Sequence, residues 1–194
     1  QVGQCIDEVG IGFLYAIKHH PAMKHAIGPR RELGQRTIFN VLGPLTNPAK
    51  ATHQLIGVYS PHLTEPLAKV LGTLGSESAW VVHGADGLDE LSNTGVNRVS
   101  ALRNGEVVTY DLNPVDFGLE IGSLDDLLGG EPAENAEITR AILSGEDKSP
   151  RRDIVLLNAG AALGLNAHDL VEGIALAKEA IDSGKADRRD AVKH

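Results

Sequence analysis

The sequence predicts an α/β fold: a central, mostly parallel sheet with an antiparallel hairpin, flanked by helices on both faces. Residues 54–59 (QLIGVY) and 79–83 (AWVVH) are typical of strands and enclose a helical pattern, so they predict a βαβ unit. The second run is apolar at nearly every position, as in a strand covered on both sides. Asn104-Gly105 lies between two further strand-like runs and favours a type I′ hairpin. We interpret residues 1–194 as one α/β domain.

The first thirty residues are predicted to contain a helix, a strand and a second helix. Apolar residues at Val2, Cys5, Ile6 and Val9 mark one face of a helix over 2–9, which Gly10 and Gly12 end. Residues 13–17 (FLYAI) are expected to form a buried strand. A turn at 19–23 then leads into a helix that reaches about Gly34.

Residues 29–48 (PRRELGQRTIFNVLGPLTNP) join an arginine-rich stretch to a proline-rich turn. The apolar run Ile38 to Leu42 predicts a short buried helix or turn. Gly43-Pro44 and Asn47-Pro48 then predict a rigid corner, because proline fixes its own φ and restricts the preceding residue. On composition alone, the arginines are interpreted as a solvated face.

Further helical patterns follow from Ser60 to the end of the sequence. Ser60-Pro61 begins a helix that Gly75 stops, and its inward face carries Leu67, Val70, Leu71 and Leu74. Residues 113–130 are interpreted as loop with a short helix, and a helix around Ile138 is closed by Gly145. Residues 154–165 predict a buried helix, and Asp169 begins the last helix. The inward residues of that last helix are Leu170, Ile174, Ala177 and Ile181.

The composition argues against two classes of partner, duplex nucleic acid and membranes. The net charge of −8 and the pI near 5.4 argue against a protein that binds duplex nucleic acid. No apolar run approaches the roughly 20 residues of a membrane span, so we expect no membrane partner. The single cysteine, Cys5, forms no internal disulfide, which favours a cytoplasmic location. The sequence begins at Gln1 without an initiator methionine, so we expect it to be the later part of a longer protein.

An acidic stretch follows the strand predicted at 79–83. Residues 84–95 (GADGLDELSNTG) contain the carboxylates Asp86, Asp89 and Glu90. In parallel α/β folds, ligands bind at the carboxyl ends of strands. Mg²⁺ commonly takes one or two carboxylates and completes its shell with phosphate oxygens. The stretch therefore indicates either a magnesium site or an acidic surface loop.

Three strings resemble the anthranilate phosphoribosyltransferase family: the segment from Arg30 to Pro48, the string GLDELS at 87–92, and HPAMK at 20–24. This resemblance implies that Arg30 holds the anthranilate carboxylate and that His20 lines the approach of the aromatic substrate. It also implies that Asp89 and Glu90 are metal ligands. Arg31 is interpreted as a surface residue, Arg36 as structural and Asn40 as a partner for backbone groups. The resemblance gives Asp86 no role.

The resemblance also implies a reaction. A phosphoribosyltransferase of this family transfers the phosphoribosyl group of phosphoribosyl pyrophosphate to anthranilate in tryptophan biosynthesis, and pyrophosphate leaves. We therefore expect Mg²⁺ as cofactor, anthranilate and phosphoribosyl pyrophosphate as ligands, and a homodimer of the full-length protein. We assign no catalytic acid or base, because an arylamine that attacks an activated sugar does not require one.

One departure from the family is large. Its phosphate-binding G-T-G-G-D loop and its K-H-G-N-R segment are not in this sequence. In the family both precede the part that Gln1 begins, as does a helical domain that forms the dimer contacts. We therefore expect this polypeptide to be inactive alone. Two other hypotheses stay open: an enzyme resembling the pyrimidine nucleoside phosphorylases, which share the fold, and a non-catalytic paralogue.

Overall fold

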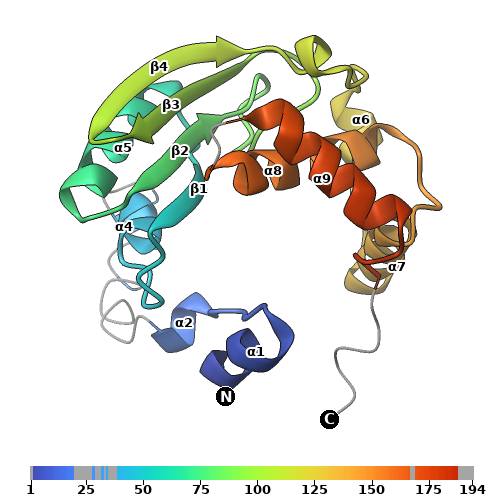
Figure 1. Ribbon diagram of the computed structural model, residues 1–194, viewed down its shortest axis with the longest axis horizontal. Coiled ribbons are helices and arrows are strands. Elements are labelled where there is room, and N and C mark those ends of the chain that lie inside the picture. The colour runs from blue at the N-terminus through green and yellow to red at the C-terminus, as the bar shows by residue number, and fades with distance from the viewer. Residues whose placement is uncertain are drawn as a thin grey trace. The chain divides into compact units, whose positions relative to one another are not determined.

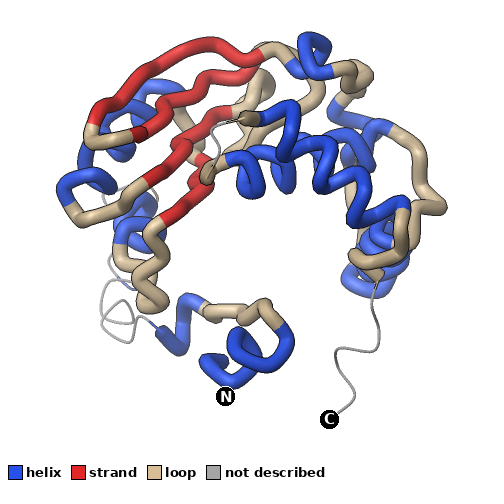
Figure 2. Tube along the Cα trace, viewed as in Figure 1, coloured by secondary structure: helices blue, strands red, loops and turns tan. Residues whose placement is uncertain are grey.

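The computed structural model describes residues 2–19, 28, 32, 34, 39–166 and 169–187. The chain divides into two compact units, Gln1–Lys50 with Arg189–His194, and Ala51–Arg188. The described helices of the first unit are α1 (Val2–Val9), α2 (Ala16–His19) and α4 (Phe39–Leu45). The second unit contains the sheet and the remaining helices (Figures 1 and 2).

The predicted helix at 2–9 is confirmed as α1, and Gly10 follows it with a φ of +84°. The strand predicted at 13–17 is wrong. Residues 11–15 form no regular element, and α2 begins at Ala16. Phe13 is 81% exposed and its ring stacks on Tyr15 at 6.3 Å between centroids. Aromatic residues favour strands only where a sheet can cover one of their faces.

The short helix predicted before the proline-rich corner is confirmed as α4, but its burial and the corner differ from the prediction. Helix α4 continues through Gly43-Pro44, and its described side chains from Asn40 to Leu45 are exposed or half-buried. Thr46 ends the helix: its backbone N–H donates to the Gly43 carbonyl at 3.1 Å, and its hydroxyl donates to the Leu42 carbonyl at 3.0 Å. Pro44 is the next-to-last residue of this helix, so it removes one backbone hydrogen bond and interrupts no further turn.

The sheet of the second unit has the strand order β1-β2-β3-β4. The strands are β1 (His53–Gly57), β2 (Ser78–His83), β3 (Asn97–Arg103) and β4 (Glu106–Leu112). β1 and β2 pair in parallel, whereas the other two pairings are antiparallel. The α/β class, the flanking helices and the hairpin are confirmed, and Asn104 and Gly105 both have positive φ. Among the described strands, the sheet is mixed and less parallel than predicted, because a loop rather than a helical crossover follows β2.

Helices cover both faces of this sheet (Figure 1). Helix α5 (Thr64–Thr73) packs against β2, β3 and β4, whereas the core on the opposite face contains residues of α8 (Pro150–Gly164) and α9 (Leu170–Asp182). Trp80 and Val82 of β2 belong to that second core. On α5, Leu67 and Leu71 are buried as predicted, but Val70 and Leu74 are exposed. The predicted inward face of α5 is therefore too wide.

Helices α8 and α9 lie close together because two glycines meet where they cross. A Cβ on Gly173 would overlap the Gly160 carbonyl oxygen, and a Cβ on Gly160 would lie 2.6 Å from Cγ1 of Ile174. The Asp169 side chain accepts from the Glu172 backbone N–H at 3.1 Å, which confirms the predicted start of α9. The four inward residues predicted for α9 are all buried.

The remaining described elements are short, apart from one helix. They are η2 (Pro61–Leu63), η3 (Pro114–Phe117), α6 (Leu124–Leu127) and α7 (Pro132–Leu143). Gly145 follows α7 with a φ of +78°, as its predicted closing role requires. Within the described ranges, every helix is too short or too polar to cross a membrane.

Candidate functional site

The acidic loop, residues 84–96, leaves the carboxyl end of β2 and returns to β3. Its first turn is closed by two backbone hydrogen bonds, Gly84 N–H to the Leu88 carbonyl at 2.8 Å and Gly87 N–H to the Gly84 carbonyl at 3.1 Å. Asp89 and Glu90 follow this turn, and both are exposed. The loop therefore presents two adjacent carboxylates beside the carboxyl ends of the parallel strands β1 and β2, as the sequence predicted.

Two strand-end glycines hold the backbone of these carboxylates close to the sheet. Gly57 ends β1, and a Cβ there would overlap the Asp89 carbonyl group. Gly84 follows β2, and a Cβ there would lie 2.8 Å from the Glu90 carbonyl oxygen. A glycine at a strand end often marks such a close approach of two backbones. The two glycines are visible in the sequence, but the sequence does not show that the backbone of Asp89 and Glu90 lies against them.

Asparagine side chains fix the residues after Glu90. Asn158 of α8 accepts from the Leu91 N–H at 3.0 Å and donates to the Leu91 carbonyl at 2.7 Å. Asn97 does the same for Ser92, at 2.7 and 2.8 Å. Both residues are buried or half-buried, where a paired amide is strongly preferred over an unpaired one. Sequence reasoning missed Asn158, which is distant along the chain and lies in an Ala/Gly-rich helix.

Asp86 forms a side-chain hydrogen bond inside the acidic loop. Its Oδ2 accepts from the Thr94 hydroxyl at 2.5 Å, and the Thr94 hydroxyl lies 2.8 Å from the Ser92 hydroxyl. Its Oδ1 is buried without a hydrogen-bond partner in the structure. Asp86 therefore stands apart from Asp89 and Glu90 and braces the loop. In the described ranges, no group of three or more His, Cys, Asp or Glu residues could hold a metal ion.

The electrostatics of the exposed pair favour a cation. Burial raises the pKa of the Glu90 carboxyl, and the negative charge of Asp89 raises it further. No described side chain donates a hydrogen bond or forms an ion pair with either carboxylate. Two hard oxygen donors with outward lone pairs fit Mg²⁺, which needs few protein ligands when phosphate oxygens complete its shell. These two residues thus suit a shared magnesium site rather than a closed protein cage.

The structure does not describe the residues that were predicted to bind anthranilate. His20 and Arg30, together with Arg31 and Arg36, lie outside the described residues. Their proposed roles toward anthranilate stay predictions. Asn40 lies on α4 and is exposed, and its predicted role as a backbone partner likewise stays a prediction.

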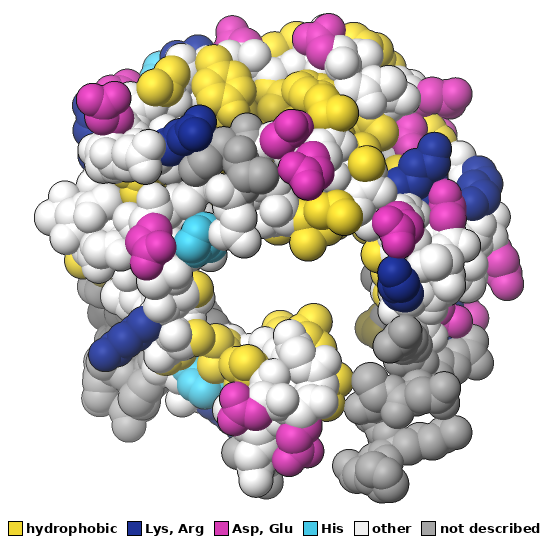
Figure 3. All heavy atoms as spheres, in the orientation of Figure 1, with side chains coloured by type: hydrophobic (Ala, Val, Ile, Leu, Met, Phe, Trp, Pro, Cys, Tyr) yellow, Lys and Arg dark blue, Asp and Glu magenta, His cyan; other side chains and the backbone are white. Residues whose placement is uncertain are grey.

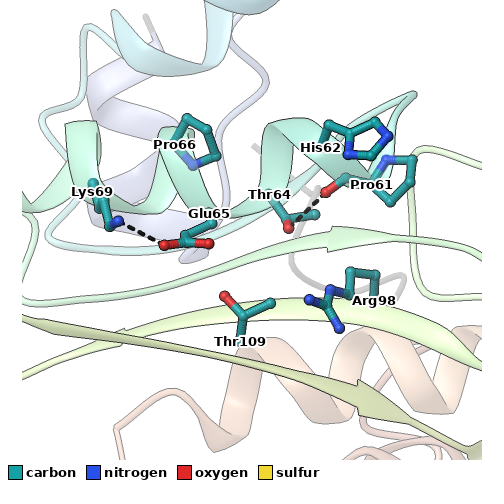
Figure 4. A pocket seen from close by; sticks show the side chains of 8 residues that line it. All are labelled: Pro61, His62, Thr64, Glu65, Pro66, Lys69, Arg98 and Thr109. Atoms are coloured by element: carbon teal, nitrogen blue, oxygen red, sulfur yellow. Dashed lines mark hydrogen bonds and ion pairs between the residues drawn. The ribbon is translucent and has the colours of Figure 1, made fainter.

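A groove of about 560 Å³ lies on the other side of the sheet, between the start of α5 and the strands β3 and β4 (Figure 4). Its charged side chains are already paired. Lys69 contacts Glu65 at 2.6 Å, and Arg98 contacts Asp111 at 2.9 Å. Figure 4 shows the first of these pairs along the edge of the groove. The groove therefore offers little unsatisfied charge to a ligand.

A second pocket, of about 510 Å³, lies beside the acidic loop and is lined by residues of α6, α7 and α8. We call it the α6–α7 pocket. Its walls are mostly apolar, and Glu90 contributes to them. The apolar wall residues include Leu88, Leu124, Leu127, Leu128, Ile138 and Val155. This pocket thus joins the candidate metal site to an apolar cavity.

Charges are mixed on one face of the molecule. On the face drawn in Figure 3, acidic and basic side chains of the described residues are interspersed, and apolar side chains lie between them. The net charge is −8.

The chain is similar to known proteins along nearly its whole length. Residues 1–187 match the model of the glycosyl transferase family, a/b domain. The anthranilate phosphoribosyltransferase of Acetivibrio thermocellus is 56% identical over 188 residues, which are 96% of this chain and 54% of that protein. The chain thus spans about half the length of the curated relatives that it matches.

The chain is also similar to solved structures of anthranilate phosphoribosyltransferases. The crystal structure of anthranilate phosphoribosyltransferase from Thermus thermophilus has a TM-score of 0.87 at 46% identity, covering 96% of this chain and 55% of that one. The Saccharomyces cerevisiae enzyme in complex with PRPP and Mg has a TM-score of 0.79 at 37% identity, covering 87% and 49%. Another structure of the yeast enzyme contains 4-fluoroanthranilate.

Proposed function

The chain belongs to the glycosyl transferase family, through its a/b domain, and we propose that it is part of an anthranilate phosphoribosyltransferase. In the proposed reaction, the amine of anthranilate attacks C1 of phosphoribosyl pyrophosphate, the C1–O bond to pyrophosphate breaks, and the amine loses a proton. The product is phosphoribosyl anthranilate, an intermediate of tryptophan synthesis.

One observation carries the proposal: two exposed carboxylates, Asp89 and Glu90, are held at the carboxyl ends of β1 and β2 and have no pairing partner among the described residues. The departing group is a polyanion and C1 becomes cationic, so the largest catalytic need is charge stabilisation at the leaving group. Mg²⁺, when bound, supplies that charge. Asp89 and Glu90 would hold it. The yeast relative's complex with PRPP and Mg supports magnesium as the ion.

The remaining work of the chain is to orient the nucleophile. By family resemblance, Arg30 would hold the anthranilate carboxylate through its planar guanidinium, and His20 would line the approach to the site. A fixed carboxylate aims the ortho amine at C1, which converts a bimolecular encounter into an oriented one. The 4-fluoroanthranilate complex of the yeast relative supports an aromatic acid as ligand.

The test uses the full-length protein and follows anthranilate consumption by its fluorescence. We expect Asp89→Asn and Glu90→Gln each to raise the Mg²⁺ concentration for half-maximal rate about tenfold, since each removes one anionic ligand. Glu106→Gln, an exposed change on β4, is the matched control and should leave the titration unchanged. An unchanged titration in both site variants would contradict the proposal.

A second experiment separates the substrate roles. Arg30→Ala should raise the KM for anthranilate far more than the KM for phosphoribosyl pyrophosphate. Equal effects on both would exclude Arg30 as the residue that binds anthranilate. The same assay on the 194-residue polypeptide tests our expectation that it does not turn over alone. A homodimer of the full-length protein and a cytoplasmic location complete the proposal, the latter because a single cysteine suits a reducing compartment.

A further inference from the structure

His83 is the last residue of β2, and its ring reaches the end of the neighbouring strand. The half-buried ring has its Nδ1 atom 2.7 Å from the carbonyl oxygen of Val58, the residue that follows β1. A carbonyl only accepts hydrogen bonds, so Nδ1 carries the proton and donates it. The neutral ring in this tautomer and the protonated ring both have an Nδ1–H, so the bond does not require a particular charge.

This bond extends the pairing of β1 and β2 beyond its last regular pair. That pair is Gly57 with Val82, and the backbone N–H of Val58 then donates to the Val82 carbonyl at 2.9 Å. Val58 is 4% exposed, and an unpaired carbonyl at a buried residue is costly. The backbone bond and the His83 bond together fix the carboxyl ends of the two strands.

The two ends of the His83 bond lie next to the two glycines that support the acidic loop. Gly57, which lies against the Asp89 carbonyl group, directly precedes the acceptor in the sequence. Gly84, which lies against the Glu90 carbonyl oxygen, directly follows the donor. Loss of the bond would let the two glycines separate, and the loop backbone that lies against both would move with them.

We propose that His83 is a positioning residue for the acidic loop: its Nδ1–H bond holds the ends of β1 and β2 together, and this fixes the backbone of Asp89 and Glu90. The placing of the loop does not depend on the proposed function. Its consequence for magnesium does rest on that function, because the two carboxylates must stay close enough to share one ion. The other ring nitrogen, Nε2, has no partner among the described residues and takes no part.

Variants of the full-length protein separate the two ring nitrogens. His83→Asn places an amide N–H where Nδ1–H lies, His83→Gln places one where Nε2 lies, and His83→Leu removes both at similar volume. The matched control is His53→Leu. His53 is exposed at the opposite end of β1, and its Nδ1 lies 3.0 Å from the hydroxyl of the adjacent Thr52.

The first measurement is amide hydrogen exchange of the metal-free full-length protein. In His83→Leu and His83→Gln, we expect about tenfold faster exchange at the Val58 and Gly84 N–H groups, whose acceptors are the Val82 and Leu88 carbonyls. His83→Asn and the control should exchange as the wild type does. Amides of α9 are the internal reference, since a protein that is destabilised as a whole would exchange faster there too.

The second measurement is calorimetric titration with the magnesium complex of pyrophosphate, the leaving group of the proposed reaction. His83→Leu and His83→Gln should each raise its dissociation constant about tenfold, because displaced carboxylates no longer share the ion well. His83→Asn should restore the affinity of the wild type, and the His53 control should keep it.

The outcomes separate this role from the proposed function. Unchanged exchange in the acidic loop of His83→Leu, or rescue by Gln instead of Asn, would overturn the positioning role. Equally faster exchange in α9 would overturn it too, because His83 would then serve only general stability. If the exchange follows the bond but neither Asp89→Asn nor Glu90→Gln weakens binding of magnesium pyrophosphate, the positioning of the loop stands and the assignment of the metal ligands fails. If those two variants weaken binding and His83→Leu does not, the proposed function stands and His83 does not position the carboxylates.

Discussion

Glycine brings two backbones together at two places in the second unit, and the consequences differ. At the crossing of α8 and α9, Gly160 and Gly173 let two helices meet deep in the core. At the ends of β1 and β2, Gly57 and Gly84 let a loop settle against the sheet, with Asp89 and Glu90 exposed. The first contact buries apolar surface and supports the fold. The second buries only backbone, and it positions two charges.

The difference predicts which property, stability or activity, a substitution at each place should lower first. A side chain forced into the helix crossing separates two layers of packed side chains, so it should lower stability first. A side chain forced between Gly57 and the acidic loop displaces a surface segment, so it should lower activity first.

The largest effect is expected from Gly173→Val. The new side chain would overlap the Gly160 carbonyl, and overpacking of this kind costs about 3 kcal/mol. Urea denaturation of the full-length protein should show a lower free energy of unfolding. Val171→Ala, on an exposed position of the same helix, should change it by less than about 0.5 kcal/mol. Equal stability of the glycine variant and the wild type would contradict the observed crossing.

Gly57→Ala should come second and should separate activity from stability. Its Cβ would push the Asp89 backbone away from β1. A displacement of about 1 Å at a catalytic site can lower kcat/KM about 100-fold, and the melting temperature should fall much less. Val96→Ala, an exposed change in the same loop, is the control. A variant that loses stability but keeps its magnesium titration would show that Gly57 serves the fold rather than the site.

Asn158→Leu joins the two regions, because Asn158 belongs to α8 and holds the backbone of Leu91. The change leaves the Leu91 N–H and carbonyl without their partner at similar side-chain volume, and should cost about 2 kcal/mol. Both the free energy of unfolding and the magnesium titration should change. If only the former changes, Asn158 anchors the helix but does not position the carboxylates.

The smallest effect is expected at the far end of α8 and α9, where Arg152 contacts Asp182 at 2.7 Å. Burial by itself raises the pKa of Asp182, but the Arg152 and Lys148 cations outweigh it, and the net pKa lies below the usual 3.8. A carboxyl with a lowered folded pKa stabilises the fold above its unfolded pKa. That contribution is lost as the pH falls through the folded value.

Asp182→Asn should therefore lower the melting temperature near neutral pH, and the gap to the wild type should narrow as the pH falls below 3.8. Asp116→Asn, an exposed change in η3, is the control and should show little gap at either pH. A gap that stays constant with pH would mean that the ion pair contributes only through packing and hydrogen bonding.

Local patterns were sufficient for much of the fold. The βαβ unit, the hairpin at Asn104-Gly105 and the start of α9 at Asp169 each depend on a few neighbouring residues, and each was predicted correctly. Predictions from apolar spacing were wrong where tertiary packing decides which apolar side chains are buried. In the run at 13–17, Phe13 and Tyr15 are exposed, and Val70 and Leu74 lie at helical spacing but outside the core.

The candidate site divides in the same way. The string GLDELS predicted an acidic loop after a strand, and the structure places Asp89 and Glu90 there with exposed carboxylates. The pattern did not identify Asn158, Gly57 or the α6–α7 pocket. Asn158 and Gly57 contact the loop from distant parts of the chain, and the pocket combines loop residues with α6, α7 and α8, whereas a periodicity argument describes only near neighbours.

The sequence by itself determined most of the helices and strands in the second unit, where the chain turns, and that an acidic stretch follows β2. Those features follow from backbone preferences and short-range spacing. Only the tertiary structure decided how deep each apolar face is buried, that Gly57 lies against the Asp89 carbonyl, and that Glu90 joins an apolar cavity to the acidic loop. The physical reason is that close packing joins residues far apart in sequence, and their distances depend on the whole fold.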